Sequence, residues 1–133
     1  MNKGTVLYIG FFELPDKNAA AHRVTANAKI LHDLGFRVVL CGEANSADSL
    51  KKGNIHKHKD YLSCNIFSKN ESIGNYLYKE FSIDYLRKLL KIFPDTVMVI
   101  AYNLPAIALN HLRIYCKRAR IVVLSDCTEW YLP

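Results

Sequence analysis

The chain lacks the features that mark membrane-spanning and secreted proteins. None of the apolar runs in its 133 residues reaches the roughly 20 residues that a membrane-spanning helix requires. The N-terminus leads into an apolar strand pattern without the charged, apolar and small-residue regions of a signal peptide. We therefore expect a water-soluble, cytoplasmic protein.

The spacing of the cysteines does not indicate a metal site. The four cysteines include no C-x-x-C pair, which argues against a zinc or thioredoxin-type site. We expect reduced thiols, with Cys41 acting as a small buried hydrophobe. His56 and His58 would lie on one face of a strand, but no third ligand accompanies them, so a solvated loop is favoured. No metal or other cofactor is expected.

Two glycine-rich phosphate-binding motifs are also missing, although the chain is basic. Neither G-x-G-x-x-G nor G-x-x-x-x-G-K-[ST] occurs. The net charge is +6, with basic clusters at 51–59 and 113–120. Such clusters can hold phosphates or an anionic membrane surface, so peripheral contact with the inner face of a membrane stays open. Nucleic acid is not expected, because no nucleic-acid-binding motif accompanies the charge.

Apolar strands alternate with amphipathic helices along the chain. Continuous apolar runs predict strands at 5–10, 36–41, 96–102 and 120–126, with a weaker one at 61–67. Together with the helices between them, they predict one Rossmann-like α/β domain over residues 1–133. With these five strands numbered in chain order, its doubly wound parallel sheet has the expected order 3-2-1-4-5.

Helix signals separate these strands. Asn18 can cap a helix that begins near Ala19 and stops at Gly35. A second helical pattern covers 73–93, which Ser82 can divide, and a third helix begins after Pro105. The polar segment 44–59 predicts a surface loop or a frayed helix. Residues expected to face the core are Ala20, Val24, Ala28, Leu31, Leu77, Phe81, Leu86, Leu89, Leu90, Phe93, Ala108, Leu112 and Tyr115.

Polar loops follow the first and last strands, where parallel sheets bind ligands. The stretch Val6–Val24 resembles the first strand, loop and helix of bacterial surface-polysaccharide glycosyltransferases of family 4. The segment Ser125–Tyr131 is similar to their D-x-T-E-W-Y motif. The resemblance implies the N-terminal, acceptor-side half of a GT-B fold, with the donor nucleotide-sugar bound mainly by a C-terminal domain that this chain does not include. Phe11 stands where relatives carry a second glycine.

The resemblance implies a site at the carboxyl ends of the strands. Asp126 and Glu129 are the expected catalytic residues, which would orient an acceptor hydroxyl or act as a base. The expected substrate-binding residues are Gly10, Phe11, His22, Arg23, Tyr102, Asn103 and Trp130. Structural roles stay open for several of them. Gly10 can simply end a strand, and Arg23 can lie on the surface. Asn103 and Asp126 can cap a turn or a helix, and Trp130 can be a packing residue.

The leading functional hypothesis is transfer of a sugar from a nucleotide-sugar to a surface polysaccharide or glycolipid, with little activity in the isolated chain. A second hypothesis is a non-catalytic subunit that docks with a separate donor-binding protein. A third is a stand-alone nucleotide- or phosphate-binding module, since a fold alone does not fix function.

Overall fold

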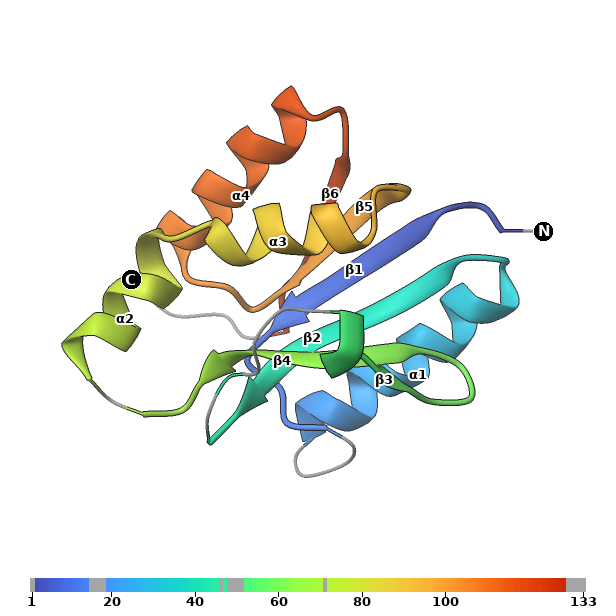
Figure 1. The fold of residues 1–133 in the computed structure, drawn as a ribbon, viewed down its shortest axis with the longest axis horizontal. Coiled ribbons are helices and arrows are strands. Elements are labelled where there is room, and N and C mark those ends of the chain that lie inside the picture. The colour runs from blue at the N-terminus through green and yellow to red at the C-terminus, as the bar shows by residue number, and fades with distance from the viewer. Residues whose placement is uncertain (1, 15–18, 46, 48–51, 71, 129–133) are drawn as a thin grey trace.

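A computed structural model describes residues 2–14, 19–45, 47, 52–70 and 72–128. Its six-stranded sheet is covered by helices on both faces (Figure 1). The strands are β1 (Thr5–Gly10), β2 (Arg37–Ala44), β3 (His56–Lys57), β4 (Leu62–Ser68), β5 (Thr96–Tyr102) and β6 (Val122–Asp126). The helices are α1 (Ala19–Asp33), a 3-10 turn η1 (Lys52–Asn54), α2 (Ile73–Phe81), α3 (Asp84–Ile92) and α4 (Ala106–Arg118).

The α/β architecture is confirmed. The strand order differs from the predicted one by an additional edge strand, β3, which lies beyond the predicted third strand, β4. The observed order is β3-β4-β2-β1-β5-β6, and all neighbours are parallel except β3 and β4. The prediction for 44–59 was wrong in part, because this segment contributes the end of β2, η1 and the antiparallel strand β3. A strand of two residues carries no periodicity from which it can be predicted.

Alternate residues of β1, β2 and β5 supply two cores. Tyr8 and Val24 belong to the core beneath α1, and both are almost fully buried. Leu7 belongs to the core on the other face, with Leu89 of α3 and Leu112 of α4. Coverage of both faces explains why these strands read as continuous apolar runs.

The helix boundaries follow the sequence signals, with one exception in burial. Gly35 has φ 102°, as a helix-ending glycine requires. The pattern over 73–93 divides at Ser82, as predicted. Leu86 and Leu89 are buried, but Leu77 and Phe81 are each 48% exposed, so the expected apolar face is incomplete in α2. The break turns α2 away from the direction of α3 (Figure 1).

The thiols and histidines show no metal site within the described residues. All four cysteines are free, and Cys41 is buried beside Cys64, with 3.8 Å between the sulfur atoms. Burial, followed by the contact with Cys64, raises the pKa of Cys41. No group of three His, Cys, Asp or Glu among the described residues is placed to hold a metal ion. Of the helices that the structure describes, none has the length and apolarity needed to cross a bilayer.

Candidate functional site

The first and last predicted loops lie at one edge of the sheet. Gly10 is paired in register with Tyr102, and Tyr102 is paired with Asp126. The carboxyl ends of β1, β5 and β6 are therefore adjacent, with β5 in the middle. This arrangement brings Gly10, Tyr102 and Asp126 to a common edge.

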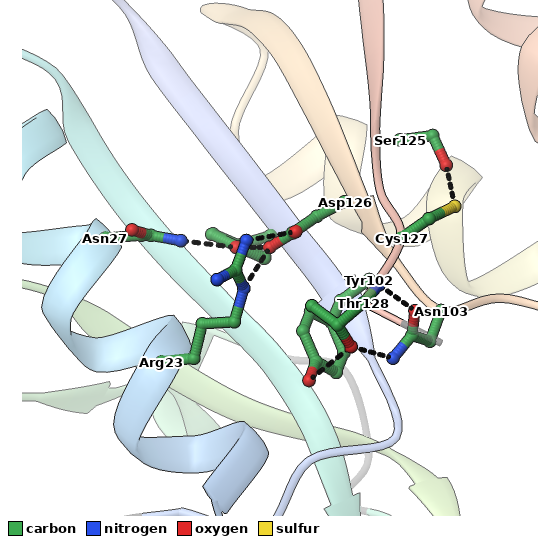
Figure 2. Close-up of polar contacts among 9 residues, drawn as sticks. Arg23, Asn27, Tyr102, Asn103, Ser125, Asp126, Cys127 and Thr128 are labelled. Carbon is green, nitrogen blue, oxygen red and sulfur yellow. Dashed lines mark hydrogen bonds and ion pairs between the residues drawn. The ribbon is translucent and has the colours of Figure 1, made fainter. Parts of the chain in front are cut away.

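Asp126 is the centre of a polar cluster formed by α1, β1 and β6 (Figure 2). The guanidinium of Arg23 donates to both carboxylate oxygens, over 2.8 Å from Nη2 to Oδ1 and 3.3 Å from Nε to Oδ2. The hydroxyl of Tyr8 donates to Oδ2. Asn27, one turn after Arg23 on the same helix face, donates to the Tyr8 hydroxyl over 3.1 Å.

The cluster holds Asp126 in its ionised form. Burial acts to raise the pKa of Asp126, but the hydrogen bonds from Arg23 and Tyr8 and the Arg23 charge outweigh it and lower the pKa. Burial and the bond to Asp126 raise the pKa of Tyr8, which therefore keeps its proton. A carboxylate held by three donors is a weak proton acceptor, so this geometry favours an orienting role for Asp126 over a role as a base.

Tyr102 and Asn103 fasten the chain that follows β6. The Asn103 side chain donates to the Thr128 hydroxyl over 2.8 Å and accepts from the Thr128 amide over 2.9 Å (Figure 2). The Tyr102 hydroxyl lies 3.3 Å from the same Thr128 oxygen. Asn103 has φ 47°, a left-handed conformation that asparagine tolerates better than most residues. These contacts give both residues a positioning role.

Gly10 and Phe11 have packing roles in the structure. A Cβ atom at Gly10 would lie 2.8 Å from both Cβ and the carbonyl oxygen of Tyr102, so only glycine fits there. The Phe11 ring packs edge-on against Phe67, with 4.9 Å between centroids. The Nζ atom of Lys79 lies 4.9 Å from the centre of the Phe11 ring.

Of the remaining predicted site residues, only His22 belongs to the part of the chain that the structure describes. His22 is exposed on α1 and does not line the cavity described below. Glu129 and Trp130 lie outside the described residues, as does Asn18. Their expected roles stay predictions.

A cavity of about 340 Å³ opens between α1 and β6, beside the Asp126 cluster. Its polar groups come from Arg23, Asn27, Ser125, Asp126 and Tyr8. Its apolar wall comes from Ile30, Leu31, Ile100 and Leu124. The side chain of Arg23 is 50% exposed, whereas that of Asp126 is 12% exposed. A ligand in the cavity would therefore meet the guanidinium more readily than the carboxylate.

The sequence analysis missed Tyr8, Asn27 and Thr128. Tyr8 lies inside an apolar strand, where its hydroxyl gives no separate signal. Asn27 had a usable signal, because it follows Arg23 by four residues and shares its helix face. Thr128 belongs to the D-x-T-E-W-Y-like segment, but no role was assigned to it.

Comparison of the chain with protein-family models, curated proteins and solved structures gave no significant match. The resemblance to glycosyltransferases therefore stays a prediction from the two sequence motifs.

Proposed function

We propose that this chain is the acceptor-side domain of a glycosyltransferase that moves a sugar from a nucleotide-sugar to a surface-polysaccharide or glycolipid acceptor. The observation that carries the proposal is the cavity between α1 and β6, with polar groups at the carboxyl edge and an apolar wall. Its volume of about 340 Å³ lies at the lower end of the range for small-molecule pockets, roughly 300–1,000 Å³. A cavity of this kind suits a sugar unit joined to an apolar carrier.

Arg23 is the principal group for acceptor binding in this proposal. An arginine side chain has five N–H donors, and Asp126 accepts from Nε and Nη2. Arg23 lines the cavity and its side chain is 50% exposed, so the unused donors can bind sugar hydroxyls or a phosphate. Asn27 uses one amide hydrogen on Tyr8. Its amide oxygen and second hydrogen are the remaining groups with which it can bind a hydroxyl.

The proposed chemistry takes place between this domain and a donor-binding domain. The acceptor oxygen forms a bond to the anomeric carbon as the bond to the nucleoside diphosphate breaks, and the acceptor proton leaves to a base or to the departing phosphate. Asp126 contributes by fixing Arg23 and Tyr8. Domain closure excludes water from such a site, so we expect negligible transfer by the isolated chain.

Binding of short-chain alkyl glycosides tests the acceptor site, because they combine a sugar with an apolar tail. We expect them, below their micelle concentration, to shift the amide NMR signals of Arg23, Asn27 and Ser125. Arg23→Gln should weaken binding about tenfold, since a hydrogen bond from a charged donor is lost. Lys29→Gln is the matched control, because Lys29 lies on α1 in an exposed pair with Asp33 and does not line the cavity.

Two outcomes would overturn the proposal. One is the absence of saturable shifts at the cavity with any alkyl glycoside. The other is tight nucleotide binding by calorimetry, which would favour a nucleotide-binding module. Turnover by the isolated chain in a transfer assay with UDP- and GDP-sugars would contradict the separate expectation that this chain is inactive alone.

A second candidate, a subunit that docks with a separate donor-binding protein, draws support from β6. Val122 is 54% exposed and Leu124 is 48% exposed, although parallel strands are usually covered on both faces. The DNA that follows codon 133 distinguishes the two candidates. A continuous donor-domain reading frame supports a single two-domain enzyme, and a separate donor-domain gene supports a split enzyme.

A further inference from the structure

A second cavity lies at the opposite edge of the sheet, independent of the proposed acceptor site. Its volume is about 320 Å³, and it is lined by residues of α1, β2 and the β3–β4 hairpin. Arg37 is the first residue of β2, and Leu62 is the first residue of β4, which places the cavity at the amino ends of the strands. In Figure 1 the hairpin lies beside α1.

Most of the charged side chains around this amino-edge cavity are cationic. Arg37, Lys57 and Lys59 line it together with a single carboxylate, that of Asp60. Asp60 Oδ1 lies 4.0 Å from Nε2 of His32. Neither Lys57 nor Lys59 forms an ion pair with a described residue, so both ammonium groups are available to an anion.

The groups around the two lysines are held in fixed positions. The amide of His58 donates to the carbonyl of Tyr61 over 2.9 Å, which closes the hairpin turn. The two rings are stacked, with 4.4 Å between centroids, and Nε2 of His58 lies 2.9 Å from the Ser63 hydroxyl. The wall between Lys57 and Lys59 is therefore ordered before a ligand arrives, which lowers the entropic cost of binding.

Arg37 lines the cavity on the β2 side, and its guanidinium is held by residues outside the lining. Its Nη2 lies 2.7 Å from Asp95 Oδ1, its Nε donates to the Thr5 hydroxyl over 2.9 Å, and its guanidinium carbon lies 5.1 Å from the centre of the Phe93 ring. The charge of Arg37 is therefore partly offset by Asp95, and Lys57 and Lys59 are the main cationic groups that an anion would meet in this cavity.

We propose that the amino-edge cavity binds a phosphate or diphosphate group through the ammonium groups of Lys57 and Lys59, with Arg37 lining the β2 side of the cavity. Phosphate suits this arrangement better than a carboxylate, because it presents more acceptor oxygens at a higher charge. The phosphate has two possible sources, a small phosphorylated metabolite or a lipid headgroup.

Titration with inorganic pyrophosphate, followed by amide NMR at physiological ionic strength, tests the site. We expect saturable shifts at His32 and over residues 57–62. The double variant Lys57→Gln/Lys59→Gln should weaken pyrophosphate binding about tenfold or more, since two charged donors are lost. The matched control is Lys91→Gln/Lys117→Gln, which removes the same charge from exposed positions on α3 and α4. We expect it to change the affinity less than twofold.

A second arm identifies the source of the phosphate. Sedimentation with vesicles of phosphatidylglycerol and phosphatidylcholine in equal parts, against phosphatidylcholine alone, reports headgroup binding. Binding to the mixed vesicles that the Lys57/Lys59 double variant loses, while the control variant retains it, assigns the site to a headgroup. Saturable pyrophosphate binding without vesicle binding assigns it to a soluble ligand. The proposal is overturned if neither probe binds, or if both double variants lose affinity equally.

Discussion

The carboxyl edge of the sheet divides at β1 into two halves, with β2 and β4 on one side and β5 and β6 on the other. On the β2 side, Phe12 is fully buried, and its carbonyl accepts a hydrogen bond of 2.9 Å from the Glu43 amide. Lys79 pairs with Glu43 over 3.5 Å and covers Phe11. This half satisfies its own polar groups and encloses its aromatic rings.

On the β6 side, the polar groups surround an open space. Arg23 is half exposed, and the cavity of about 340 Å³ lies beside it. The difference between the halves shows that strand direction brings polar loops to an edge, whereas the packing of the side chains decides which part of that edge stays open to a ligand. Two apolar rings pack over the first half, and polar side chains that bond to one another line the open second half.

Removing the buried ring should have the largest effect. Phe12→Ala deletes a side chain that contacts Tyr8 and Tyr102, each with 6.3 Å between ring centroids. We expect the free energy of unfolding to fall by about 3–5 kcal/mol, as for other buried phenylalanines. Urea denaturation compares this variant with Phe81→Ala, whose side chain is 48% exposed. An equal loss of stability in Phe81→Ala would contradict the expectation that the buried ring contributes more.

A methyl group added at Gly42, next to the Phe12 carbonyl, should have a smaller effect. At Gly42 a Cβ atom would lie 2.4 Å from the carbonyl oxygen of Phe12, so the loop must shift. We expect Gly42→Ala to destabilise the fold by roughly 1–3 kcal/mol. Gly53→Ala is the control, because no atom lies within 4 Å of its added Cβ. Equal thermal stability of the two variants would show that the packing of Gly42 against Phe12 is looser than the structure indicates.

The smallest effect should come from the open half and should depend on pH. Because the pKa of Asp126 is lowered by folding, its ionisation stabilises the folded state above the unfolded value of about 3.9. That stabilisation is lost as the pH falls through the lower folded value. Asp126→Asn should therefore cost about 1 kcal/mol at pH 7, and the difference from the unmodified chain should shrink below about pH 4.

Urea titrations at several pH values test this dependence. Asp33→Asn is a suitable control, because Asp33 forms an exposed pair with Lys29 on the same helix. A cost for Asp126→Asn that persisted unchanged at the lowest pH would rule out the charge as its origin.

Parallel strands have a fixed direction, and this is why the shared edge of Gly10 and Asp126 was predictable. The packing of Phe11 was not, because its partners Phe67 and Lys79 are distant in sequence and meet it only in the folded chain. The cluster around Asp126 was predictable in part. Arg23 and Asp126 are charged residues that can be recognised in the sequence, whereas the hydroxyl of Tyr8 belongs to an apolar strand pattern and gives no separate signal. Elsewhere in the fold, β3 was not predictable because two residues are too few to form a pattern.

The hydrogen bond between the Glu43 amide and the Phe12 carbonyl continues the contact of the chain with β2 past the end of β1. The residues that follow β6 are held differently, by contacts between the side chain of Asn103 and Thr128. Local opening is easier where fewer buried contacts must break. We therefore expect Cys127 and Thr128 to adjust to a ligand more readily than the joined ends of β1 and β2.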